Sequence, residues 1–91
     1  MGLFSGLFKK KDELFAKSGE LSMEDIEQIQ AALKDKMDAD VYNSVFNQAC
    51  RLIPKKQYKE AIAIFESIRE NSTDAYEQGS CESQIGVCHF F

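Results

Sequence analysis

Apolar and polar residues alternate along the chain with the period of amphipathic helices. Between residues 22 and 37, apolar side chains recur every three or four positions, and Glu, Gln, Lys and Asp occupy most positions between them. This spacing places one apolar stripe along an α-helix, because a helix turns once every 3.6 residues. The stripe consists of Met23, Ile26, Ile29, Leu33 and Met37. Ser22 is suited to cap the first turn of this helix.

The same period predicts four further helices, at about residues 3–17, 41–53, 58–70 and from residue 74 towards the C-terminus. Pro54 should end the third, because proline disfavours helical geometry in the residue before it. No segment shows the strict alternation of a half-buried strand. We therefore predict an all-α protein of about five helices, arranged as antiparallel hairpins.

Short polar residues mark where these helices begin. Asp38 or Asp40 can cap the third helix, and Thr73 or Asp74 can cap the fifth. Glu77 is placed to close a capping box onto Asp74. A break at residues 18–19 divides the chain into an N-terminal amphipathic helix (1–20) and a helical domain (21–91).

Residues 58–65 combine a small side chain, Ala61, with an aromatic one, Phe65, one helical turn later. Where two helices cross closely, a small residue lets the backbones approach and an aromatic ring fills the space beyond. Ala49 supplies a small residue on the preceding helix. With Tyr58 opening the segment, it resembles the second helix of a tetratricopeptide repeat. The resemblance implies helix pairs stacked into a right-handed superhelix.

The resemblance covers one full repeat and the first helix of a second. Ile85 and Gly86 look like the Leu-Gly step that opens the next repeat, but Gly86 follows Ala49 by about 37 residues, against about 34 in the family. The first helix also departs from the family, because Val45, Gln48 and Leu52 stand where Trp, Leu and Tyr are usual. Thr73 stands in place of the closing proline.

A repeat of this kind cannot bury its apolar face alone, so the last helix should need a covering partner. Three arrangements supply one. The N-terminal helices can fold back, a second copy can form a homo-oligomer through the C-terminal helix, or the chain can belong to a longer repeat array.

Charge and cysteine content limit the classes of partner and compartment. With 11 basic and 15 acidic residues, the net charge of −4 argues against nucleic-acid binding, which needs a basic surface. Three cysteines are an odd set, and no cleavable signal peptide precedes them. We therefore expect a reducing, cytoplasmic setting.

The residues that carry chemistry are few. Cys81 and Cys88 lie seven residues apart without the close pairs of a structural zinc site, so we expect them and Cys50 to be packing residues and expect no metal or cofactor. His89 is adjacent to Cys88, and neighbours on a helix point about 100° apart, which is poor geometry for a catalytic pair. We expect no enzymatic activity.

These observations favour a scaffold or adaptor that binds a peptide or protein in a helical groove. In the resembling family the concave face is lined mostly by the first helix of each pair. Amides and an arginine there suit recognition of peptide backbone and carboxylates. The candidate residues are Asn43, Asn47, Gln48, Arg51, Gln78, Glu82 and Gln84.

An alternative function is a peripheral membrane module anchored by the N-terminal segment. Leu3, Phe4, Leu7 and Phe8 precede three lysines, a pattern that interfacial helices use at anionic membranes. Gly6 stands where an N-myristoylation motif needs Ser or Thr, so lipidation is not expected. The simpler interpretation is that these apolar residues dock on the helical core.

Overall fold

The computed structural model describes residues 14–15 and 20–91. Within these ranges the chain contains no strand and forms four helices: α2 (Met23–Asp35), α3 (Ala39–Leu52), α4 (Tyr58–Asn71) and α5 (Ala75–Phe90). The predicted all-α class is confirmed for this part of the chain. Of the helix predicted at 3–17, only Leu14 and Phe15 are described, and both have helical geometry. The apolar stripe and lysines of residues 3–11 lie outside the described residues.

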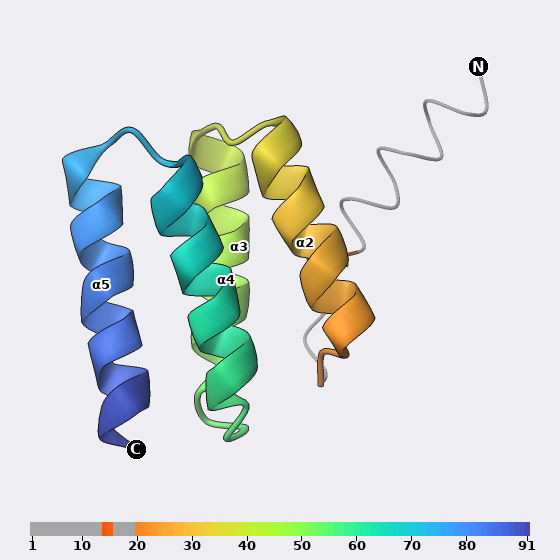
Figure 1. Ribbon diagram of the computed structural model, residues 1–91, viewed down its shortest axis with the longest axis vertical. Coiled ribbons are helices and arrows are strands. Elements are labelled where there is room, and N and C mark those ends of the chain that lie inside the picture. The colour runs from red at the N-terminus through yellow and green to blue at the C-terminus, as the bar shows by residue number, and fades with distance from the viewer. Residues whose placement is uncertain (1–13, 16–19) are drawn as a thin grey trace.

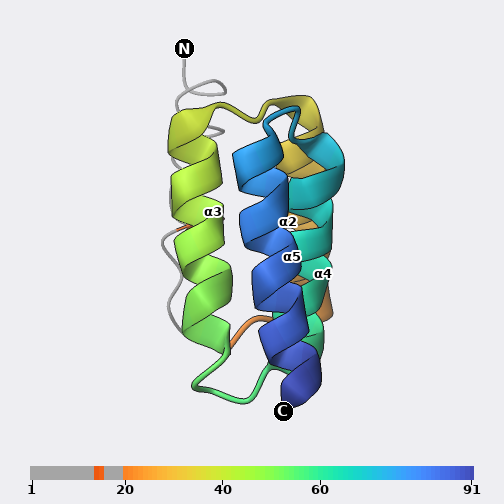
Figure 2. The ribbon, with the colours of Figure 1, turned by 90° about the vertical axis from the view of Figure 1, so that its left-hand side faces the viewer.

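Consecutive helices run antiparallel, so α2 and α4 point one way and α3 and α5 the other (Figure 1). The α3–α4 pair lies in the middle, with α2 on one side and α5 on the other (Figures 1 and 2). α4 packs against all three other helices. This arrangement makes α4 the centre of the fold and leaves α5 at one edge of the described molecule.

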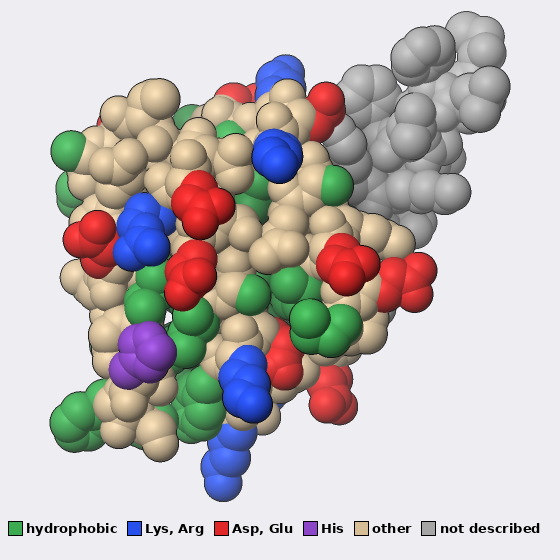
Figure 3. Space-filling model, viewed as in Figure 1, with side chains coloured by type: hydrophobic (Ala, Val, Ile, Leu, Met, Phe, Trp, Pro, Cys, Tyr) green, Lys and Arg blue, Asp and Glu red, His purple; other side chains and the backbone are tan. Residues whose placement is uncertain are grey.

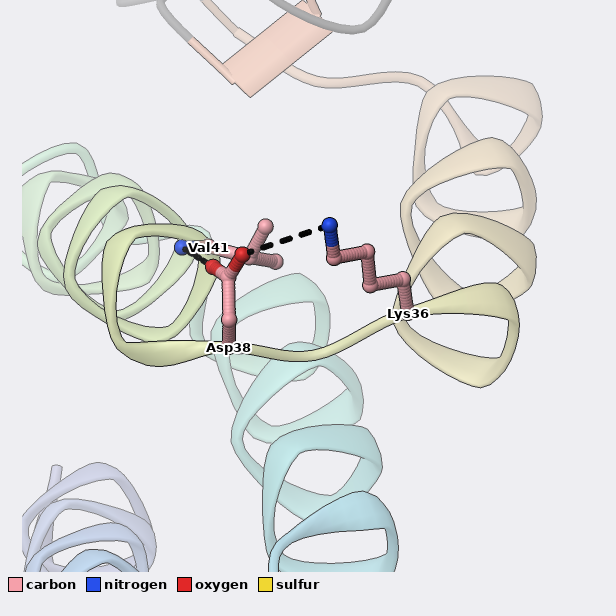
Figure 4. Close-up of polar contacts among 3 residues, drawn as sticks. All are labelled: Lys36, Asp38 and Val41. Atoms are coloured by element: carbon pink, nitrogen blue, oxygen red, sulfur yellow. Dashed lines mark hydrogen bonds and ion pairs between the residues drawn. The ribbon is translucent and has the colours of Figure 1, made fainter.

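Polar caps fix where the helices begin, largely as the sequence predicts. Ser22 and Asp25 form a reciprocal capping box at the start of α2, with N–O distances of 3.1 and 3.0 Å. Asp38, rather than Asp40, caps α3 by accepting a hydrogen bond of 2.9 Å from the Val41 N–H. Its other carboxylate oxygen lies 3.8 Å from the Lys36 ammonium group (Figure 4). That ion pair is exposed and adds little to stability.

Asp74 caps α5, but the capping box predicted with Glu77 is wrong. The Asp74 carboxylate accepts from the N–H groups of Tyr76 and Glu77 at 2.7 and 3.2 Å. The Glu77 carboxylate instead accepts a hydrogen bond of 2.6 Å from the Ser72 hydroxyl. Glu77 therefore stabilises the α4–α5 turn through Ser72 and does not bind the backbone N–H of Asp74.

The core forms where the four helices meet, and it contains the residues expected at the α3–α4 crossing. Ala49, Ala61 and Phe65 are all fully buried. The Phe46 ring on α3 meets the Phe65 ring on α4 edge-on, with ring centroids 5.2 Å apart. The other buried apolar residues are Leu21, Ile26, Ile29, Ala32, Leu33, Val45, Leu52, Ile64, Ile68, Cys81 and Cys88.

Two positions assigned to packing do not take part in it. Met23 was expected on the inner stripe of α2, but it is 67% exposed, because it lies at the edge of the arc that Ile26, Ile29 and Leu33 define around the helix. Gly86 was expected as the glycine of a Leu-Gly step that opens a second repeat. A Cβ added at Gly86 would meet no described atom within 4 Å, so no described neighbour requires a glycine there.

Two glutamine side chains tie the N-terminal part of the chain to the helical core. The Gln57 amide, at the start of α4, accepts from the Leu21 N–H and donates to the Leu21 carbonyl, both at 3.2 Å. The Gln48 side chain on α3 donates to the Leu14 carbonyl at 2.6 Å. Leu14 and Phe15 pack against the core, so this part of the predicted 1–20 segment shares the core of the helical domain.

Candidate interaction surface

Three of the predicted groove residues share one face. Asn43, Asn47 and Arg51 are exposed and follow one another at intervals of four along α3, which places them in a line on its solvent side. We call these residues the α3 stripe. Two amides and a guanidinium group in a line can donate to and accept from a peptide backbone, or hold a carboxylate.

Gln48 does not belong to this surface. Its side chain is 1% exposed, and it lies about 100° around α3 from Asn47. The amide donates to the Leu14 carbonyl, so it satisfies the backbone of a docked segment rather than a ligand. The prediction that Gln48 lines a groove is wrong because its partner comes from 34 residues away in the sequence.

Gln78 and Glu82 on α5 are also separated from the α3 stripe. Gln78 is half-buried and donates to the Ser72 carbonyl at 2.7 Å, which holds the α4–α5 turn. Glu82 is exposed. Ser80 is bonded to Tyr42, so Ser80 lies on the side of α5 that faces α3. Residues two positions apart on a helix are turned by 200°, which places Glu82 on nearly the opposite side. Glu82 therefore faces away from α3, and the predicted residues do not line one groove.

The thiols lie at the junction of α3, α4 and α5 and behave as packing groups. Cys81 and Cys88 are buried and Cys50 is half-buried, and all three are free. Burial, with a smaller contribution from the Glu77 carboxylate, raises the pKa of Cys81 to about 11. Burial also raises the pKa of Cys50 and of Cys88. The thiolate is the nucleophile and the metal ligand, so these shifts disfavour both roles at neutral pH.

Metal and nucleophilic sites are not assembled in the described ranges. Across residues 14–15 and 20–91, no three His, Cys, Asp or Glu side chains come close enough together to hold a metal ion. Tyr42, which contacts α5 through Ser80, has its pKa raised by burial, so its phenol stays protonated. The remaining feature with a distinct chemistry is the solvent side of α5.

The arc of α5 centred on the exposed Ser83 carries no charged residue, and the exposed Glu82 lies about 100° away from its centre. Seen down the helix axis, the side chains that point within 60° of Ser83 lie on the side opposite the buried Cys81 and Cys88. We call this surface the α5 outer face, and it consists of Tyr76, Gly79, Ser80, Ser83, Gly86, Val87 and Phe90. Six of the seven are exposed and Ser80 is half-buried. Two aromatic residues thus stand at the ends of a shallow strip of small residues.

The exposed aromatics are large, and the one near the C-terminus has apolar neighbours. Tyr76 is 81% exposed and Phe90 is 88% exposed. Phe91, 70% exposed, stacks on the ring of Tyr58 with centroids 5.5 Å apart and extends the apolar surface around the end of the helix. Figure 3 shows hydrophobic side chains at the surface where α5 ends.

Tyr76 and Phe90 lie within the helix predicted from residue 74 onwards, but the sequence pattern alone was not used to assign them a face. The signal was present in the spacing. Tyr76 and Phe90 are 14 residues apart, four turns of a helix, and lie on the opposite side from Cys81 and Cys88. A helix with apolar residues on two opposite sides has two surfaces to cover.

Comparison with known proteins yields no relative: no family model matches the chain, and no curated protein or solved structure is significantly similar to it. Of the helices in the described part, none is both long enough and apolar enough to cross a bilayer.

Proposed function

We propose that this chain is a non-catalytic protein–protein interaction module and that the α5 outer face is its main contact surface. The observation that carries the proposal is a helix face of seven residues without a charge, in a chain where 29% of residues are charged. Exposed apolar groups on soluble proteins often mark interaction sites when they gather on one surface, and this face carries Tyr76, Val87 and Phe90.

The size of the patch supports this function. The exposed parts of Tyr76 and Phe90, together with the adjoining Phe91, present an apolar area on the order of 500 Å², divided between the two ends of the helix. Exposed apolar surface of this extent on a small protein often marks an interaction site. Covering this area with a partner removes it from water at no cost in buried charge.

A tetratricopeptide-like arrangement is part of the proposal. The buried Ala49, Ala61 and Phe65 at the α3–α4 hairpin support it, and α5 packs on α4 as the first helix of a following repeat would. The open surroundings of Gly86 lie where such a repeat would receive its next helix. The α3 stripe then offers polar contacts on a separate surface. The free thiols suit a cytoplasmic setting.

A photoreactive phenylalanine analogue at position 83 tests the contact surface. Ser83 is exposed at the centre of the α5 outer face, and Gln28 is exposed on α2 and serves as the matched control position. Irradiation in the native host should give a discrete cross-linked protein from position 83, identified by mass spectrometry, and none from position 28. No product from position 83, or the same products from both positions, would contradict the proposal.

A further inference from the structure

We propose that the partner of the α5 outer face is a second copy of this chain, bound so that the two α5 helices pack antiparallel across a twofold axis near Ser83. The inference rests on the proposed function and names its partner. It is drawn from the order of residues on the face.

The face is close to self-complementary about its centre. Tyr76 lies seven residues before Ser83 and Phe90 seven residues after it. Both aromatics therefore stand about 10 Å from the centre along the helix, in opposite directions. When one helix is turned antiparallel to its copy, each Tyr76 meets the Phe90 of the other. A twofold interface requires this property, because the same patch serves both subunits.

The small residues match in the same way. Gly79 and Gly86 lie on one flank of the face, four residues before and three residues after Ser83. The twofold operation keeps each flank on its own side, so Gly79 of one copy meets Gly86 of the other. On the opposite flank Ser80 is half-buried and bonded to Tyr42 of α3, so Val87 is the exposed residue there. Glycine and serine at the contact allow the helix axes to approach to about 8 Å, the lower end of the usual range.

The two glycines have no other structural explanation in the described chain. Neither has a positive φ, and a Cβ at either position would meet no described atom within 4 Å. A glycine inside a helix costs about 1 kcal/mol relative to alanine. In the antiparallel pair, a Cβ at these positions would lie between the two helices.

The buried area sets the strength of the association. A stable interface buries about 800 Å² on each partner, and the exposed rings of Tyr76, Phe90 and the adjoining Phe91 together present only about 500 Å². We therefore expect a weak dimer that dissociates on dilution. The Glu82 carboxylates of the two copies lie on the same flank near the axis, and their repulsion weakens the dimer further.

Sedimentation equilibrium of the full chain over a wide concentration range tests the inference. The wild-type mass should rise from that of the 10.3 kDa monomer towards twice that value. Ser83→Lys should remain monomeric, because each copy would place its charge against the same charge of its partner. Gln28→Lys, which puts the same charge on the exposed side of α2, should dimerise like the wild type. Circular dichroism checks that both variants keep their helices.

Mixing charge variants separates a second copy from other occupants. Ser83→Glu alone should also remain monomeric, whereas an equimolar mixture of Ser83→Lys and Ser83→Glu should form a mixed dimer, since residue 83 meets residue 83 across the axis. A wild-type chain that stays monomeric at all concentrations, or a mixture that does not associate, would overturn the inference. If the monomeric chain still gives a position-83 cross-link to a different protein, the proposed function stands with another partner. If it gives none, both fail.

Discussion

Helices α2 and α5 flank the same central pair, yet they differ in where their charged and apolar residues lie. α2 buries Ile26, Ile29 and Leu33 on one side, and its opposite side carries Glu24, Glu27, Gln28 and Lys34. α5 buries the thiols Cys81 and Cys88, and its opposite side is the uncharged outer face. One helix separates apolar and charged residues, and the other does not.

This difference shows that position at the edge of a bundle does not by itself determine the chemistry of a helix surface. The solvent side of α2 is polar because water covers it, and its long aliphatic residues supply the packing. α5 contributes smaller groups to the core and keeps its large aromatic side chains on the outside. The packing of α5 within the chain therefore accounts for only part of its apolar surface.

The largest expected difference between the two helices lies in their inner stripes. Ile29→Ala on α2 should lower the free energy of unfolding by about 2–5 kcal/mol, because it removes a fully buried aliphatic side chain. Cys81→Ala on α5 should cost about 1 kcal/mol, because only a small thiol is lost. Urea denaturation measures both. Equal losses would show that α5 contributes as much as α2 to the core.

The caps of the two helices should differ by less. Asp74→Ala should destabilise the protein by about 1–2 kcal/mol, because the carboxylate accepts two backbone N–H groups and interacts with the helix dipole. Ser22→Ala should cost about 1 kcal/mol, since the hydroxyl accepts one. Thermal unfolding of the two variants gives the order, and the reverse order would contradict this account.

Alkaline pH should lower the free energy of unfolding through the Cys81 thiol on the inner side of α5. The pKa of Cys81 is raised in the folded protein from its ordinary value of 9.0 to about 11, so folding favours the protonated thiol. Its stabilising effect is complete below pH 9 and is lost as the pH rises through 11. The free energy of unfolding should therefore fall more steeply over this interval in the wild type than in Cys81→Ala. Ile29→Ala should keep the wild-type slope, and a Cys81→Ala slope equal to it would contradict the prediction.

The smallest effect concerns the glycines of the α5 outer face. At concentrations where the chain is monomeric, Gly79→Ala and Gly86→Ala should each raise the free energy of unfolding by about 0.5–1 kcal/mol. Ala31→Gly on the exposed side of α2 should lower it by a similar amount. The glycine variants should also dimerise less than the wild type in sedimentation equilibrium. If the glycine variants are more stable but dimerise as well as the wild type, the glycines do not belong to the interface.

Local signals in the sequence were sufficient to place the helices. Ser22 and Asp74 begin helices because their side chains reach N–H groups two or three residues away, and α3 ends two residues before Pro54. Contacts of this range depend on neighbouring residues alone, so the sequence pattern contains them. The inner positions of α2 beyond its first turn follow from its period for the same reason.

The candidate site depended on contacts that the local pattern does not contain. Gln48 has the composition of a groove residue, but its partner is the carbonyl of Leu14, far away in the chain. Glu82 lies on the side of α5 away from α3, and only the contact between Ser80 and Tyr42 fixes that orientation. The α3 stripe could be predicted because three exposed residues at intervals of four share a face in any helix.

The Gln57 side chain has a consequence for how the molecule opens. Its amide occupies both backbone hydrogen-bonding groups of Leu21, as a neighbouring β-strand would, across a separation of 36 residues. The entrance to α2 is thus fastened to the first residues of α4, and neither end can fray without releasing the other. Fraying at these two helix starts should consequently be coupled. The slowest-exchanging amides near residue 21 and those in the first turn of α4 should therefore show similar free energies of opening in hydrogen exchange.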